Sequence, residues 1–95
     1  MYSAIRKYKI NPSDVDEVVR RIHTEFVNLI SQAPGFVHYY LVHDGSGTVV
    51  TVSVFQDQAS ADESTRLAAE WIRQNLTSLV QSPPDVTAGE VIVHK

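Results

Sequence analysis

The chain has 95 residues, 43% of them hydrophobic and 20% charged, which is ordinary for one globular domain spanning residues 1–95. It contains no cysteine, so disulfides, zinc–thiolate sites and thiol catalysis are excluded. The net charge of −3 argues against nucleic-acid binding through a basic surface. Arg6, Lys7 and Lys9 interrupt the early apolar stretch, which does not resemble a signal peptide and favours a cytoplasmic location.

The first 35 residues predict a strand followed by a helix. Residues 2–10 alternate in character, which places Arg6 and Tyr8 on one face of the strand. Asn11-Pro12 is typical of a helix start, with Asn as the N-cap and Pro in the first turn. Apolar residues then recur at three- and four-residue spacing up to Ile30 and predict one buried stripe, which ends before Pro34-Gly35.

Residues 36–55 predict two strands joined by a tight turn at residues 44–47. We take the turn to close symmetrically, with His43 opposite Thr48. One face then carries an apolar set that is expected to meet the helices: Val37, Tyr39, Leu41, Val50, Val52 and Val54. The opposite face is mixed: Phe36, His38, Tyr40, Val42, Val49, Thr51, Ser53 and Phe55.

A second helix and a last strand complete the chain. Ser60-Ala61-Asp62-Glu63 has the form of a capping box at the start of this helix, and Ser82-Pro83-Pro84 is expected to end it. Its buried residues are expected among Leu67, Ala68, Trp71, Ile72, Leu76 and Leu79. Residues 87–94 read as the last strand.

The element order β-α-β-β-α-β predicts an α+β fold of the ferredoxin-like type. Its four-stranded antiparallel sheet has the order 4-1-3-2, with two helices on one face. The mixed sheet face left uncovered would expose a large patch, which predicts a homodimer whose two sheets enclose a barrel. The expected dimer interface consists of His38, Tyr40, Thr51, Ser53 and Phe55.

Four stretches resemble one family across the whole chain: IRKYKINPSDVDEV, PGFVHYYLV, SVFQDQASADES and RLAAEWIRQNL. They are similar to the antibiotic-biosynthesis-monooxygenase-like domains of the dimeric α+β barrel superfamily. Some members are cofactor-independent monooxygenases of polycyclic aromatic quinols, and others degrade haem. The resemblance implies a pocket between sheet and helices that takes a small aromatic ligand without a cofactor. Its wall would be Arg6, Tyr8, Tyr39 and Trp71.

The haem-degrading branch fits this chain poorly. Its members resemble one another in an Asn on the first strand and a Trp/His pair on the second helix. Here Arg6 takes the place of that Asn, Ser64 stands near the expected Trp, and the second helix has no His.

Four side chains are the main candidates for chemistry. If the first strand turns its Tyr8 side to the helices, Arg6 is buried and needs a partner, which is either an anionic or phenolate oxygen of a ligand or an acidic group on a helix. The alternative is that this strand faces the other way. Trp71 and Tyr39 either stack on a planar ligand or fill the core. His23, beside the apolar stripe, is a candidate general base or a structural residue. The four histidines lack metal-ligand spacing, so no metal is predicted.

Three functions are consistent with this fold. The first is a cofactor-independent monooxygenase in which Arg6 stabilises a substrate anion and His23 is a possible base. The second is a non-catalytic dimeric module for small-ligand binding or assembly, which would lack a cavity beside Arg6 and Trp71. The third is RNA recognition, but residues 48–54 have none of the basic and aromatic side chains that it requires.

Overall fold

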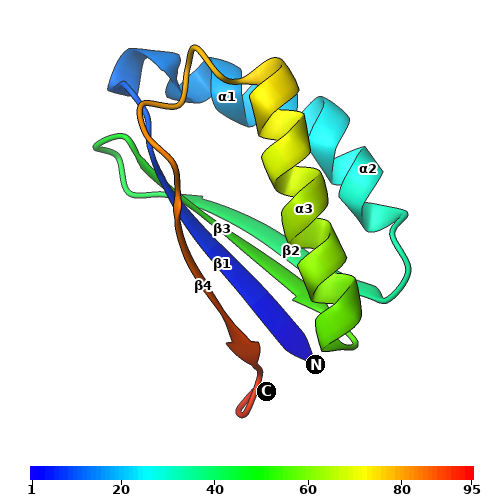
Figure 1. Cartoon of the computed structure of the whole chain (residues 1–95). Coiled ribbons are helices and arrows are strands. Elements are labelled where there is room, and N and C mark those ends of the chain that lie inside the picture. Colours follow the sequence, from blue (N-terminus) through cyan, green and yellow to red (C-terminus); the bar gives the residue numbers. More distant parts are fainter.

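A computed structural model describes residues 1–95 as a four-stranded antiparallel sheet covered on one face by helices (Figure 1). The strands are β1 (Tyr2–Lys9), β2 (Phe36–His43), β3 (Thr48–Phe55) and β4 (Asp85–Glu90). Their order is β2-β3-β1-β4, which is the predicted order 4-1-3-2 counted from the other edge of the sheet. The ferredoxin-like topology is thus confirmed. None of the helices is both long enough and apolar enough to span a membrane.

The first helical segment is not one regular helix. It consists of a 3₁₀ turn (Pro12–Asp14), α1 (Val15–Arg21), a π-helical turn (Ile22–Phe26) and α2 (Val27–Ser31). The Asn11 side chain accepts a hydrogen bond from the Ser13 amide at 3.0 Å, which confirms the predicted cap. The buried residues Val18, Ile22, Phe26 and Ile30 are four apart, which exceeds the 3.6 residues of an α-helical turn. The wider π turn keeps this stripe facing the sheet.

The second helix, α3 (Gln58–Asn75), differs from the prediction at both ends. Its N-cap is Asp57, which accepts a hydrogen bond from the Ser60 amide at 2.8 Å, so the predicted capping box at Ser60 is wrong. The helix ends before Leu76, whose side chain is buried in the core, and not at residues 82–84. The chain can then turn back toward the sheet, where Val80 pairs with Ile10.

The last strand lies two to four residues earlier than predicted. β4 pairs with β1 from Asp85, opposite Lys7, to Glu90, opposite Tyr2. Because Tyr2 is the first residue of β1, the strand pairing ends at Glu90, and one further hydrogen bond joins the Val91 amide to the Met1 carbonyl at 2.9 Å.

The hairpin has a different register from the predicted one, and the difference turns β3 over. His43 lies opposite Val49, Tyr39 lies opposite Ser53, and an irregularity between Phe36 and His38 absorbs the one-residue shift. The residues of β3 that face the helices are therefore Val49, Thr51, Ser53 and Phe55, all buried. The prediction that Val50, Val52 and Val54 meet the helices is wrong. Because successive side chains of a strand point to opposite faces, a register shift of one residue exchanges the two faces of β3.

This register also corrects the expected outer surface. Thr51, Ser53 and Phe55 lie under the helices and cannot form a dimer interface on the outer face. His38 and Tyr40 do lie on the outer face and are exposed. The outer sheet face is more apolar than predicted, with these members: Ile5, Tyr40, Val42, Val50, Val52 and Val54.

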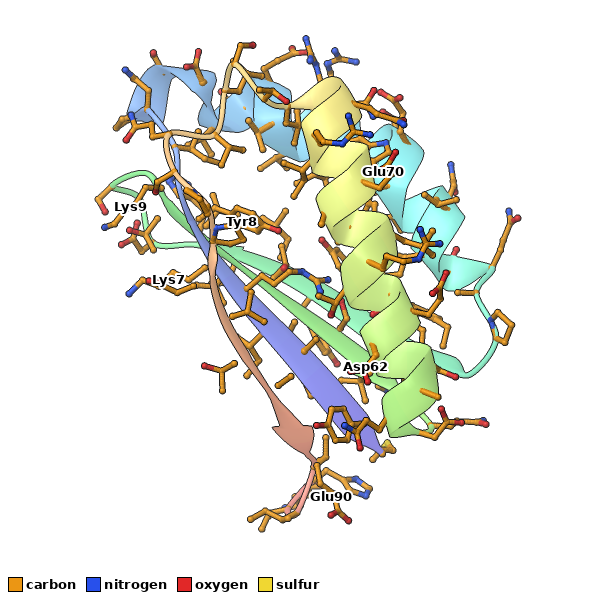
Figure 2. The ribbon with its side chains drawn as sticks, viewed as in Figure 1. Lys7, Tyr8, Lys9, Asp62, Glu70 and Glu90 are labelled. Carbon is orange, nitrogen blue, oxygen red and sulfur yellow. The ribbon has the colours of Figure 1, made fainter.

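Successive side chains of β1 alternate between the two faces of the sheet. Ala4, Arg6 and Tyr8 are buried, whereas Ile5, Lys7 and Lys9 are exposed. Figure 2 shows Tyr8 directed toward the helical layer and the two lysines directed away from it. The side chains of Ala4, Arg6 and Tyr8 therefore lie between the sheet and the helices.

Gly47 fixes the hairpin turn against the end of β1. Its carbonyl accepts a hydrogen bond from the Ile10 amide at 2.8 Å, and its φ of +103° favours glycine. A Cβ at this position would lie 2.3 Å from the Ile10 carbonyl oxygen, whereas one at Gly45, with φ +90°, meets nothing within 4 Å.

We expect Gly47→Ala to lower the free energy of unfolding by at least about 2 kcal/mol more than Gly45→Ala, because both changes strain φ but only Gly47 also meets backbone atoms. Urea unfolding of both variants and the wild type measures this difference. Equal losses in the two variants would contradict the proposed anchoring of the turn at Gly47.

Candidate functional site

Arg6 lies at the centre of the helix-facing side of the sheet. Its side chain is only 3% exposed. Nη2 donates to the Ser53 hydroxyl of β3 at 2.8 Å, and Nη1 donates to the Thr65 hydroxyl of α3 at 3.2 Å. The four ion pairs of the chain all join residues within single helical segments, and none includes Arg6. The alternative of a salt bridge from Arg6 to an acidic helix residue is therefore wrong.

A guanidinium that is buried with only neutral partners is an energetically expensive arrangement. Desolvation of a charge costs several kcal/mol, which neutral hydroxyl groups offset only in part. The guanidinium has five N–H donors in a planar fork, and the two hydroxyl groups use only some of them. The remaining donors suit a carboxylate, phenolate or enolate oxygen.

A small cavity adjoins this guanidinium, and we call it the inner cavity. Its volume is about 10 Å³, which is room for roughly one water molecule. Its lining includes Arg6, Tyr8, Phe26, Tyr39, Thr51 and Trp71. The structure thus brings together the four residues expected in the pocket wall, which come from β1, β2 and α3.

Phe26 joins the aromatic side chains of this wall. Its ring meets Tyr39 edge-on, with centroids 5.8 Å apart, and Trp71 in a tilted arrangement at 5.5 Å. The sequence placed Phe26 only in the buried stripe of the helix, since its periodicity does not show which stripe residues border a cavity. The three rings make an apolar wall opposite the charge of Arg6.

Thr51 is the lining residue that the sequence analysis assigned to the wrong face. It is 2% exposed, and its hydroxyl oxygen has no partner at hydrogen-bonding geometry. The Tyr39 phenol lies close enough for Thr51 to oppose, as the smallest effect, the rise in the pKa of Tyr39. An unpaired buried hydroxyl costs about 1–3 kcal/mol, so few native structures keep one without a reason. Since Thr51 pairs with Arg6 across β1 and β3 and lines the same cavity, a ligand oxygen bound there would have two anchors.

The two tyrosines of the inner cavity are neutral across the physiological pH range. Burial raises the pKa of Tyr39 to about 12, although the positive charge of Arg6 opposes this effect. Burial also raises the pKa of Tyr8, again against the opposing charge of Arg6. Both phenols therefore exchange hydrogen bonds with a ligand as neutral groups and do not act as bases.

His23 lies outside the inner cavity. It is exposed on the π-helical turn and lines a separate groove of about 320 Å³ together with Tyr39 and Leu41. Tyr39 and Ile22 line both spaces. The structure thus does not bring His23 together with Arg6, and its role as a base stays a prediction.

A larger, open space, which we call the outer pocket, adjoins the inner cavity. It has a volume of about 390 Å³ and shares Arg6, Tyr8 and Ile72 with the inner cavity. Its walls are α3 and the segment of residues 80–86, which descends from the end of α3 to β4 at the sheet edge (Figure 1). This volume is within the range of about 300–1,000 Å³ that is usual for small-ligand sites.

The chain offers no cluster of metal ligands. Nowhere do three or more His, Asp or Glu side chains come together so that they could hold a metal ion. The polar groups that converge on the inner cavity are instead one guanidinium, one free hydroxyl and two phenols. This set suits the oxygen atoms of an organic ligand.

Comparison with known proteins bears on both fold and family. The family model described as antibiotic biosynthesis monooxygenase matches residues 1–69. A solved protein of unknown function from Nitrosomonas europaea has a TM-score of 0.83 at 18% identity, covering 99% of this chain and 91% of that chain. The comparison with curated proteins finds no match.

Two further solved structures with this fold contain ligands. One is a monooxygenase from the gene ActVA-Orf6 of Streptomyces coelicolor in complex with Nanaomycin D (TM-score 0.74, 16% identity, 98% of this chain and 92% of that chain). The other is the heme-degrader MhuD from Mycobacterium tuberculosis with two hemes in its active site (TM-score 0.77, 12% identity, 100% and 99%). At these identities the similarity shows a common fold.

We expect the free energy of unfolding to fall as pH rises from about 10 toward about 12, since the unfolded chain ionises Tyr39 at its ordinary pKa while the folded chain keeps it neutral. Tyr39→Phe should remove about 2 kcal/mol of this loss at pH about 12. The Tyr39→Phe variant should keep part of the pH dependence, because burial also raises the pKa of Tyr8. Urea unfolding at a series of alkaline pH values measures both slopes, and identical slopes would contradict the burial of the Tyr39 phenol.

Proposed function

This chain belongs to the antibiotic biosynthesis monooxygenase family, and we propose that it is a cofactor-independent monooxygenase of a small aromatic, quinol-type substrate. The observation that carries this proposal is the Arg6 guanidinium, 3% exposed and without an anionic partner, beside a cavity walled by aromatic rings. Such a site favours a ligand with both a planar ring and an oxygen that can become negative.

In the proposed complex the substrate oxygen takes hydrogen bonds from Arg6 and Thr51. The guanidinium favours the phenolate over the phenol and so lowers the pKa of the bound hydroxyl group. The hydroxyl of Thr51 gains the partner that it lacks in the free protein. Tyr39 and Trp71 contact the faces or edges of the ring, and Tyr8 donates from its neutral phenol.

The chemistry follows from the electron-rich anion. Such an anion reduces O₂ directly, so the protein needs to bind, ionise and desolvate the substrate. For a ring with a reactive CH₂ group, one oxygen atom becomes the new ketone oxygen and the other leaves as water. The two C–H bonds supply the four electrons, and the phenolic proton goes to solvent and returns with the product.

No carboxylate or histidine lines the inner cavity, so the electrostatic effect of Arg6 is the main means of ionising the substrate in this proposal. The phenolic proton has a route to solvent through the outer pocket, which Arg6 and Tyr8 also line. His23 lines only the separate groove, so it would take part only through a movement of Tyr39 or Ile22, the two residues that line both spaces.

Binding of a ring requires the inner cavity to widen. Its present volume of about 10 Å³ holds roughly one water molecule. The outer pocket already offers about 390 Å³, and Ile72 lines both spaces together with Arg6 and Tyr8. We propose that the ring enters from the outer pocket, displaces the Ile72 side chain and reaches Arg6 with its oxygen.

The small size of the inner cavity also supports a second candidate, a non-catalytic module that binds a small apolar ligand. Such a module would use the same anchors without activating oxygen. RNA recognition gains no support, since the outer face of β3 presents Val50, Val52 and Val54 where an RNA-binding sheet needs basic and aromatic side chains.

We also propose that the chain forms a homodimer through the outer sheet face. Tyr40 and Val42 are 55% and 56% exposed there, next to the valines of β3, and water contact with such a patch is unfavourable. Two copies packed face to face would cover both patches with two-fold symmetry.

For the enzymatic proposal, we expect Arg6→Met to reduce oxygen consumption with dihydroxyanthracenone by about 100-fold, since the substrate anion loses its charged donor. The unfolding free energy should stay within about 2 kcal/mol of the wild type, because the variant also removes the cost of burying a charge. Oxygen-electrode rates with mass analysis of the product measure the activity. Equal rates in both proteins would exclude Arg6 from the mechanism.

Thr51→Val and Thr65→Val provide the matched comparison for the same assay. Thr51→Val removes an unpaired hydroxyl and should weaken substrate binding without destabilising the fold. Thr65→Val removes a hydroxyl that accepts from Arg6 and donates to the Ala61 carbonyl, so it should destabilise the fold. Fluorescence of Trp71, the one tryptophan, reports binding. Quenching without oxygen consumption would favour the non-catalytic module.

For the dimer, we expect sedimentation to give twice the mass of one chain, and Val52→Glu to give a single chain, since a carboxylate at the centre of the outer face opposes sheet packing. Gln58→Glu adds the same charge at the exposed start of α3 and should remain dimeric. A monomeric wild type at micromolar concentration would refute this interface.

A further inference from the structure

The outer pocket has an unusual charge for this acidic chain. Its charged lining residues are two arginines, Arg6 at the inner end and Arg73 on α3, and no acidic residue lines it. The chain as a whole carries a net charge of −3. A concave space with two cations and no anion attracts a negative ligand group.

We propose that the outer pocket is a subsite for an anionic side arm of the aromatic ligand, with Arg73 as the residue that binds its carboxylate. This inference rests on the proposed function, in which Arg6 receives the phenolic oxygen of the same ligand. The substrate class is thereby narrowed to hydroxylated aromatic compounds that carry an acidic substituent away from the reacting ring.

The remaining lining of the outer pocket fits such an arm. Ile72, Val80 and Val86 offer apolar contacts to a short aliphatic linker. Gln81 and Ser82 line the same pocket and provide an amide and a hydroxyl group that can donate to the carboxylate oxygens. Thr65 and Thr77 also line it, but their hydroxyl groups already donate to backbone carbonyls of α3. The pocket thus offers both apolar contacts for a linker and polar donors for an acid.

Arg73 is able to exchange its present partner for a ligand. It pairs with Glu70 on the same helix at 2.7 Å, and the Arg73 side chain is 68% exposed. Figure 2 shows Glu70 on the upper part of α3. Exposed pairs of this kind contribute only about 0–1 kcal/mol, so a ligand carboxylate can compete with Glu70 for the guanidinium.

Arg66 offers a matched control on the same helix. It pairs with Glu63 at the same three-residue spacing, and its side chain is 63% exposed. It does not line the outer pocket. A change at Arg66 removes the same charge and the same kind of ion pair while leaving the proposed subsite intact.

The test compares two ligands that differ only at the arm: hydroxynaphthyl-propanoic acid and its primary amide. Near neutral pH the acid is ionised while both naphthol groups are neutral. We expect calorimetric titration of the wild type to show about tenfold tighter binding of the acid, which corresponds to about 1.4 kcal/mol. Arg73→Gln should bind both ligands equally, and Arg66→Gln should keep the preference.

The outcomes separate this inference from the proposed function. If Arg73→Gln retains the preference for the acid, the subsite is wrong, whatever Arg6 does. If Arg6→Met binds both ligands as tightly as the wild type, Arg6 is not the anchor of the ring and the proposed function fails. If Arg6→Met binds both ligands more weakly but keeps the preference for the acid, the result supports the subsite and the proposed function. No binding of either ligand to the wild type overturns both.

Discussion

The buried guanidinium of Arg6 is the interaction on which the rest of the site depends. It joins β1 to Ser53 of β3 and to Thr65 of α3, so one side chain ties the sheet to its covering helix. Neutral hydroxyl groups hold the guanidinium in place but do not neutralise it. A carboxylate from the fold would have neutralised the charge, and a ligand anion would then have to displace that carboxylate. The present arrangement keeps the charge available.

The aromatic side chains around Arg6 make this arrangement tolerable. Tyr8, Phe26 and Trp71 are buried in the main core, and their packing stabilises the fold while one charge remains incompletely satisfied. Arg6 is only 3% exposed beside these rings, which limits its contact with water. A ligand ring that enters would replace some of these contacts and would supply the missing oxygen. The stability of the free protein and its affinity for a ligand are thus set by the same side chains.

The chain shares its fold with proteins of only 12–18% identity, among them a monooxygenase and a heme-degrader. At such identities the common feature is the framework of sheet and helices, and the chemistry depends on the side chains that each chain places between them. In this chain the site contains Arg6 and the Thr51 hydroxyl, between the aromatic rings of Tyr39 and Trp71.

The sequence by itself determined the order of the elements, the Asn11 cap, the sheet topology and the placement of Arg6 and Tyr8 on one common face of β1, because local periodicity and turn residues specify these features. That this face of β1 meets the helices was decided by the tertiary structure. Only the tertiary structure decided the register of β2 against β3, the ends of α3 and the existence of the outer pocket. In the observed register, β2 has an irregularity and Gly47 is hydrogen-bonded at the end of β1. Thr51 therefore lies at the cavity and not on the expected outer face. Pairing between strands depends on contacts across the whole sheet, and no local pattern in residues 36–55 distinguishes two registers that differ by one residue.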